Sequence, residues 1–156
     1  MIDIDVPGFG RLMLDAALID FNGTLARDGV LHPGVADRLR SLSGSLELHV
    51  ATADTHDNAR SALARLPVAL HVLEPTGQAD AKRRILAGLD YSRTAAIGNG
   101  RNDRAMLADA ALSIAVCGAE GCAVEALSAA HVVCRDACEA LDLLLLPRRL
   151  IATLRD

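Results

Sequence analysis

Short apolar runs alternate along the chain with longer segments whose apolar positions recur at helical spacing. Runs bounded by turn-forming residues predict strands, and the longer periodic segments predict helices. The predicted strands cover residues 16–21, 46–51, 68–73, 94–97, 113–116 and 131–134. The predicted helices cover residues 32–42, 56–66, 78–89, 103–110 and 122–129, followed by a closing helix that starts near residue 136 and is broken by Pro147.

Strands that alternate with helices at such short intervals indicate right-handed crossovers and a mostly parallel sheet between two helix layers. We therefore predict an α/β, three-layer Rossmann-like fold that forms one domain over residues 1–156. Alternating apolar positions at 2–6, a turn at 7–10 and an apolar run at 12–14 predict an N-terminal β-hairpin. Residues 25–31 could form a second short hairpin over the end of the first core strand.

Composition narrows the class of protein. At 156 residues, with 51% hydrophobic residues but only 2% aromatic ones, the chain can build a substantial core mainly from aliphatic side chains. The apolar runs are too short to span a bilayer, and an acidic N-terminus is unlike a signal peptide, so we expect a cytoplasmic protein without a membrane partner. A net charge of −4 gives no basic footprint for nucleic acid.

The four cysteines lack both the paired spacing and the accompanying histidines of a zinc site. We expect reduced, mostly buried thiols, with metal binding as the less favoured alternative. They are Cys117, Cys122, Cys134 and Cys138.

The first candidate for chemistry is Asp20, which directly follows an apolar strand and precedes a polar Asn-Gly-Thr turn one residue later. In open α/β sheets, ligands bind at the carboxyl ends of the strands. A carboxylate at that edge can act as a nucleophile or as a magnesium ligand. The alternative is an aspartate that only begins a turn.

Three further positions fall at the same edge of the predicted sheet. Thr52 ends a strand just before a helix, where its hydroxyl could bind an anion or cap the helix. Lys82 is the only lysine among 16 basic residues, and it lies in the first turns of a helix, where a cation opposes the helix dipole. This position indicates a negatively charged ligand. Asp103 closes a glycine-containing turn and could hold a metal ion or its water.

These four segments, in this order, resemble the motifs of the haloacid dehalogenase superfamily, whose members transfer phosphate through an aspartyl-phosphate. The first motif, Asp-x-Asp-x-Thr, is similar to residues 20–24, and Thr52 and Lys82 match the second and third motifs. Residues 98–103 match the acidic fourth motif. The resemblance runs from about residue 16 to the C-terminus, without a cap domain, and is nearest to the phosphorylation domain of P-type ATPases.

The resemblance implies Mg²⁺ as cofactor and Asp20 as the nucleophile. The implied catalytic residues are Asp20, Asn22, Thr52 and Lys82. The implied substrate-binding residues are Asn22, Gly23, Thr52, Ala53, Lys82 and Asn102. The implied metal ligands are Asp20, Asn22 through its backbone carbonyl, Asn99 and Asp103.

Two residues depart from the superfamily pattern. Asn22 stands where phosphatases have the aspartate that protonates the leaving group and then activates water, and loss of such an acid–base typically costs about 10²–10⁴-fold in rate. Asn99 stands where a carboxylate usually binds the metal, so we expect weaker binding unless Asp103 or Asp54 compensates. His56 could serve as a surrogate base, or it could simply face solvent at a helix start.

These departures favour acyl phosphates or phosphoanhydrides over alkyl monoesters and predict weak turnover of generic monoesters. The enzyme hypothesis is a Mg²⁺-dependent phosphohydrolase or phosphotransferase. The alternative is a catalytically weak module that binds a phosphate ligand or regulates a partner. A kinase-dependent receiver domain fits less well, because residues 1–15 lack the acidic pair that such domains place on their first strand.

The expected partner is a small phosphorylated molecule or a phosphoprotein. A homo-oligomer is also possible, because the apolar segments 141–146 and 150–151 could supply an interface. Alternatively, these segments pack on the protein's own sheet.

Overall fold

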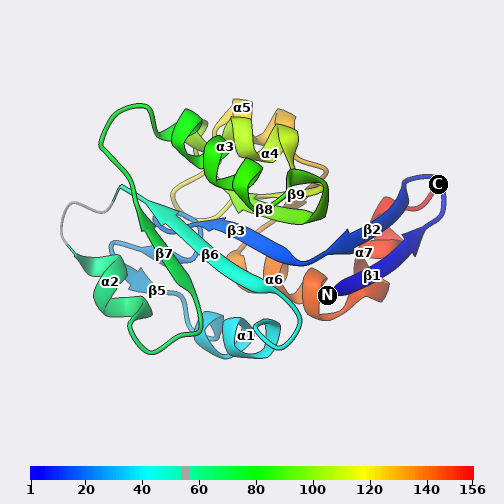
Figure 1. Cartoon of the computed structure of the whole chain (residues 1–156), viewed down its shortest axis with the longest axis horizontal. Coiled ribbons are helices and arrows are strands. Elements are labelled where there is room, and N and C mark those ends of the chain that lie inside the picture. The colour runs from blue at the N-terminus through cyan, green and yellow to red at the C-terminus, as the bar shows by residue number, and fades with distance from the viewer. Residues whose placement is uncertain (54–56) are drawn as a thin grey trace.

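The computed structural model describes residues 1–53 and 57–156 of the chain (Figure 1). Asp54 and His56 therefore lie outside the described residues. A six-stranded sheet forms the centre of the fold, in the order β10-β9-β8-β3-β6-β7, and each of its pairings is parallel. Its strands are β3 (Ala16–Asp20), β6 (Glu47–Thr52), β7 (Ala69–Val72), β8 (Thr94–Gly98), β9 (Leu112–Val116) and β10 (Val132–Cys134). The predicted α/β fold with a parallel sheet is confirmed.

Helices cover both faces of this sheet. They are α1 (Val35–Leu42), α2 (Asn58–Leu63), α3 (Gln78–Gly88), α4 (Arg104–Asp109), α5 (Val124–Ala129), α6 (Ala137–Leu145) and α7 (Pro147–Leu154), with short 3₁₀ turns η1 (Tyr91–Arg93) and η2 (Arg101–Asp103). Figure 1 shows α3, α4 and α5 on one face, while α1 and α6 lie on the other. The three-layer arrangement follows from strands that are apolar on both sides.

The central strand β3 has five buried residues. Ala17 and Ile19 pack in the larger core cluster with side chains of α1 and α6, whereas Leu18 packs with Leu86 of α3 on the other face. Because side chains alternate along a strand, Asp20 points toward the same helix layer as Leu18. This alternation decides which helix can supply a partner for the carboxylate.

Both predicted hairpins are confirmed. Strands β1 (Ile2–Val6) and β2 (Gly10–Leu14) pair antiparallel, and Figure 1 places them beside α7 and both chain termini, away from the strand ends that hold Asp20. Strands β4 (Ala26–Arg27) and β5 (Val30–Leu31) form the short second pair. Between β3 and β6, the chain therefore holds this pair and α1.

Some boundaries differ from the predictions. The described part of α2 is shorter at its end than predicted, because the chain turns at residues 64–67 before β7. Pro147 does more than break the closing helix, because it occupies the first turn of a separate helix, α7. Proline suits that position, since the first amide groups of a helix have no intrahelical partner.

The apolar C-terminal segments mainly pack inside the molecule. The larger core cluster buries Leu141, Leu144 and Leu150. For these residues, the alternative prediction that the segments pack on the protein's own sheet is confirmed. Leu146 remains 45% exposed at the junction of α6 and α7. In the described residues, the helices are too short or too polar to traverse a bilayer.

Candidate functional site

Asp20 ends the central strand and is almost completely buried, with a side-chain exposure of 9%. Strands β6 and β8 flank β3 on its two sides, so the carboxylate lies at the middle of the sheet edge. Residues that follow β6 and β8 can therefore reach it from both sides.

Lys82, on α3, is fully buried and donates hydrogen bonds to two carboxylates. Its Nζ lies 2.5 Å from Asp20 Oδ1 and 2.6 Å from Asp103 Oδ1. The second oxygen of Asp103 accepts hydrogen bonds from the backbone N–H groups of Asn99 and Gly100, at 3.0 and 2.8 Å. The charged group of three side chains carries one more negative than positive charge, and backbone amides partly offset that excess.

Burial and charge perturb this group strongly. Burial raises the pKa of Asp20 to about 7, the negative charge of Asp103 adds to the rise, and Lys82 and Thr24 oppose it. Burial lowers the pKa of Lys82, but the two carboxylates outweigh burial and hold it above its usual value. The ammonium therefore stays charged, and the carboxylate of Asp20 gains from any further cation placed beside it.

Thr24 connects Asp20 to the loop after β8. Its buried hydroxyl lies 3.3 Å from Asp20 Oδ2 and 3.2 Å from Asn99 Oδ1, and it can donate to either oxygen. The turn before it depends on Gly23, whose φ of +80° suits glycine. A Cβ at Gly23 would lie 2.5 Å from Asn99 Nδ2, so the turn and this loop are in close contact.

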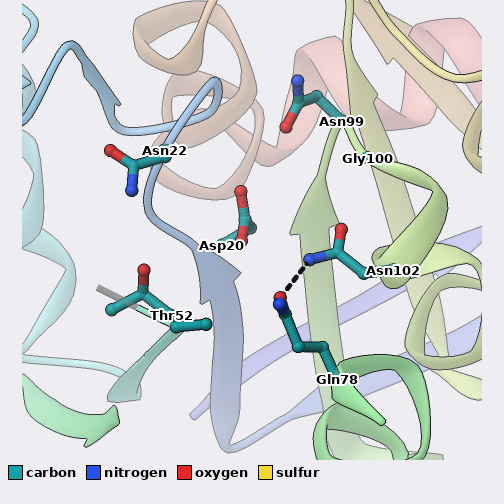
Figure 2. A pocket seen from close by; sticks show the side chains of 8 residues that line it. Asp20, Asn22, Thr52, Gln78, Asn99, Gly100 and Asn102 are labelled. Atoms are coloured by element: carbon teal, nitrogen blue, oxygen red, sulfur yellow. Dashed lines mark hydrogen bonds between the residues drawn. The ribbon is translucent and has the colours of Figure 1, made fainter. Parts of the chain in front are cut away.

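A cavity of about 330 Å³ opens above Asp20 (Figure 2). Figure 2 shows Asp20 among side chains from β6, from the turn after β3 and from the loop after β8. The cavity is lined by Asp20, Asn22, Thr52, Ala53, Gln78, Asn99, Gly100 and Asn102. Six of the predicted site residues thus share one cavity, although they come from three separate segments.

The other predicted site residues lie next to the cavity and do not line it. Lys82 and Asp103 have no exposed surface, and they lie behind Asp20 as its buried partners. Gly23 lies close to the Asn99 side chain. The predicted convergence of residues 20, 82 and 103 is therefore a direct contact, whereas Thr52 faces Asp20 across the cavity.

Sequence reasoning missed Gln78 and Thr24 as site residues, and it did not place Glu120 near the turn that follows Asp20. Gln78 lines the cavity and accepts a hydrogen bond of 2.7 Å from Asn102 Nδ2. Gln78 lies four residues before Lys82 and therefore on the same face of the helix, so helical spacing from Lys82 could have indicated it. Thr24 is the last residue of the first motif, and Glu120 was not signalled by any motif.

The donors at the cavity suit a hard cation. Asp20, Asn22 and Asn99 line the cavity, and their carboxylate, backbone carbonyl and side-chain amide, in that order, offer oxygen, which Mg²⁺ prefers. Among the described residues, however, three or more His, Cys, Asp or Glu side chains do not gather into a group that could hold a metal ion. Asp103, also a predicted ligand, already accepts hydrogen bonds at both oxygens. The residues thus fit a magnesium ion that keeps much of its water.

The cysteines differ from the prediction of mostly buried thiols. All four are free, but only Cys134 is buried, and the other three are half-buried. Cys117 and Cys122 are only half-buried because they flank a surface turn. Cys138 is half-buried because it lies in the first turn of α6.

Comparison with known proteins by sequence finds uncharacterized relatives in Methanocaldococcus jannaschii. The uncharacterized protein MJ0073 of Methanocaldococcus jannaschii is 38% identical over 87 residues, which cover 56% of this chain and 84% of the relative. No family model matches the chain.

Solved structures show the fold. The 3-deoxy-D-manno-octulosonate 8-phosphate phosphatase of Yersinia pestis superposes with a TM-score of 0.70 at 19% identity, over 97% of this chain and 95% of that one. The same phosphatase of Moraxella catarrhalis, solved with a magnesium ion, a phosphate ion and its sugar, gives 0.71 at 16% identity, over 91% and 94%. This chain thus has the fold of haloacid dehalogenase (HAD) family hydrolases, and by sequence it belongs to the same family as MJ0073.

Proposed function

We propose that the protein is a Mg²⁺-dependent phosphohydrolase or phosphotransferase that acts through an aspartyl-phosphate at Asp20. The observation that carries this proposal is the position of Asp20, which ends the central strand, is held by Lys82 and Thr24, and faces the cavity. The phosphatases that share the fold support the reaction class.

The residues of the chain would have the following roles in the reaction. Asp20 attacks phosphorus, and Lys82 opposes protonation of the carboxylate and aligns it through a 2.5 Å hydrogen bond. Thr24 orients the second oxygen of the same carboxylate. Thr52 faces the cavity, where its hydroxyl can donate to a phosphoryl oxygen. Positioning and charge stabilisation of this kind supply most of the catalysis of phosphoryl transfer.

The metal would be held by Asp20, by the backbone carbonyl of Asn22 and by Asn99. When bound, Mg²⁺ supplies positive charge that neutralises the phosphoryl group and reduces its repulsion of the nucleophile. Asp103 would act behind these ligands, because its contacts fix both Lys82 and the backbone at residues 99–100.

Asn22 limits the substrates. An amide can neither protonate a leaving group nor activate water, so the reaction needs a leaving group that departs as an anion. Acyl phosphates and phosphoanhydrides meet this requirement, and simple alkyl monoesters do not. The second half of the reaction, in which water releases phosphate from Asp20, should be slow for the same reason.

The test measures phosphate release from acetyl phosphate and from p-nitrophenyl phosphate, with and without Mg²⁺, in the wild type and two variants. Asp20→Asn should abolish turnover, and Asn22→Asp should raise monoester hydrolysis. If Asp20→Asn turns over as fast as the wild type, the enzyme proposal is wrong.

A second candidate function is a module that binds a phosphorylated ligand without turning it over. It is favoured by one observation, namely that amides line the cavity at both Asn22 and Asn99, where the superfamily usually has carboxylates. Calorimetric binding of a phosphate analogue that depends on Asp20 and Mg²⁺, without turnover of either substrate, would select this candidate.

A further inference from the structure

Two half-buried cysteines flank a tight turn that follows β9. The chain reverses at residues 118–121, where Gly118 and Gly121 pair as antiparallel neighbours and the Gly121 N–H donates a 2.9 Å hydrogen bond to the Gly118 carbonyl. The φ of Gly121 is +79°, which suits glycine. Because Cys117 and Cys122 directly adjoin the two paired glycines, the turn holds them beside each other.

The two thiols interact directly. Burial, and a hydrogen bond between the Cys122 and Cys117 side chains, raise the pKa of Cys122 to about 11. The Cys122 thiol also donates a hydrogen bond to the Ala123 carbonyl across 3.7 Å. The contact places the two sulfurs side by side, as thiol–disulfide exchange between them requires.

The remaining cysteines have different surroundings. Cys134 is buried in β10, and burial raises the pKa of its thiol to about 11. The Cys138 thiol donates to the Pro33 carbonyl across 3.3 Å. These two residues therefore provide matched controls within the same chain.

The turn between the cysteines contacts the candidate site. Asn99 Nδ2 donates to the carbonyl of Gly121 across 3.2 Å, and the Ala123 N–H donates to the carbonyl of Asn99 across 2.8 Å. Glu120, in the turn between the cysteines, lies close to the turn that follows Asp20, since a Cβ at Gly23 would lie 2.8 Å from its Oε2. A change in the turn at residues 118–121 therefore acts first on Asn99 and on the turn that contains Gly23.

We propose that Cys117 and Cys122 form a reversible intrachain disulfide, a modification site whose redox state is transmitted to Asn99 through the turn between them. The proposal is independent of the function proposed above, because it concerns the thiols and the backbone that they flank. A disulfide needs Cα atoms roughly 4.4–6.8 Å apart, and in a regular antiparallel pairing the residues next to a hydrogen-bonded pair lie about 4.5 Å apart.

The oxidant is a small-molecule disulfide, such as oxidised glutathione. One of the two protein thiols, as its thiolate, attacks one sulfur of that disulfide, forms a mixed disulfide and releases one thiol. The other protein thiol then loses its proton and attacks the protein sulfur of the mixed disulfide, which releases the second thiol. The two protein thiols thus give up two electrons and two protons, and one molecule of disulfide becomes two thiols.

Peptide mapping tests the bond directly in the wild-type chain. The protein is equilibrated with reduced and oxidised glutathione in varied ratios, free thiols are alkylated, and the chain is cut with trypsin and with a protease that cleaves after glutamate. Glu120 lies between the two cysteines, so every cysteine falls on a different fragment, namely residues 105–120, 121–125, 126–135 and 136–139. We expect fragments 105–120 and 121–125 to be linked, with the loss of two hydrogen atoms.

Variants test the roles of the two sulfurs. Cys122→Ser should stop the reaction at glutathione attached to Cys117, whereas Cys134→Ser and Cys138→Ser should give the wild-type link. Oxidation of the wild type should shift the amide NMR signals of Asn99 and Gly23, and oxidation of Cys122→Ser should not produce the same shifts.

Three results would overturn the proposal. One is the absence of the linked fragments in fully oxidised glutathione while the circular dichroism spectrum remains that of the folded protein. Another is a link that involves Cys134 or Cys138. The third is a Cys117–Cys122 disulfide that leaves the amide signals of Asn99 unchanged, which would refute transmission to the site.

Discussion

Replacement of Lys82 by methionine should destabilise the protein strongly and in a pH-dependent manner. The change removes the buried ammonium that lies 2.5 Å from Asp20 Oδ1 and 2.6 Å from Asp103 Oδ1. Since both oxygens contact one nitrogen, they are about 5 Å apart or closer, and at an effective dielectric constant of about 20 two unit charges at that distance repel by about 3 kcal/mol. Breaking a buried ion pair typically costs about 3–5 kcal/mol, and we expect a loss of about 4 kcal/mol at pH 8.

The pH dependence follows from the raised pKa of Asp20. In the wild type, that pKa is about 7, so between pH 4 and 7 the folded state holds a proton that the unfolded state releases, and this contribution to stability declines as the pH rises. Without Lys82, the folded pKa rises further, and the same decline continues above pH 7. The difference in free energy of unfolding between wild type and variant should therefore grow above pH 7, by up to about 1.4 kcal/mol per pH unit.

Urea unfolding followed by far-ultraviolet circular dichroism measures this difference, since the chain has no tryptophan. The control is Arg83→Met on the same helix, which removes an exposed ion pair with Asp109 and should cost less than about 1 kcal/mol at either pH. A Lys82→Met variant that loses under about 1 kcal/mol at pH 8, or whose loss is the same at pH 6 and pH 8.5, would refute the reasoning.

Three further predictions concern the same site. Asn22→Asp should accelerate release of phosphate from the phosphorylated chain by about 10²-fold or more, measured by quenched-flow after removal of acetyl phosphate, and an unchanged rate would exclude water activation at this position. Stabilisation by Mg²⁺, measured as the shift in melting temperature, should be larger at pH 8 than at pH 6, because a proton competes for Asp20 below about pH 7, and Asp20→Asn should lose this difference. Gly98→Ala should cost about 1–3 kcal/mol in chemical denaturation, because the new Cβ would lie 2.5 Å from Asp103 Cγ, and a neutral result would mean that the loop can move aside.

Much of the fold could be predicted because local patterns and tertiary structure agree. The central strand reads as apolar on both faces, and it is buried on both faces in the sheet. The ends of helices were less predictable where one residue can either end a helix or begin one. Pro147 ends one helical pattern but begins α7, and the sequence alone does not decide between a break and a new start.

The site could be predicted in part, because strand ends in a parallel sheet meet at one edge. This rule brought Asp20 and Thr52 to one cavity and Asp103 to the buried group behind it. It could not predict that Lys82 lies behind the cavity, because the depth of a long side chain depends on how α3 packs. Glu120 was missed for a related reason, since its approach to Gly23 depends on a surface turn without a motif.

Mass spectrometry of the chain after incubation with acetyl phosphate and Mg²⁺ tests the nucleophile most directly. We expect one added phosphoryl group, labile to hydroxylamine and located on the peptide that contains Asp20, and we expect none in Asp20→Asn. A phosphoryl group on another residue, or equal labelling of Asp20→Asn, would contradict the assignment of Asp20 as the group that accepts phosphate.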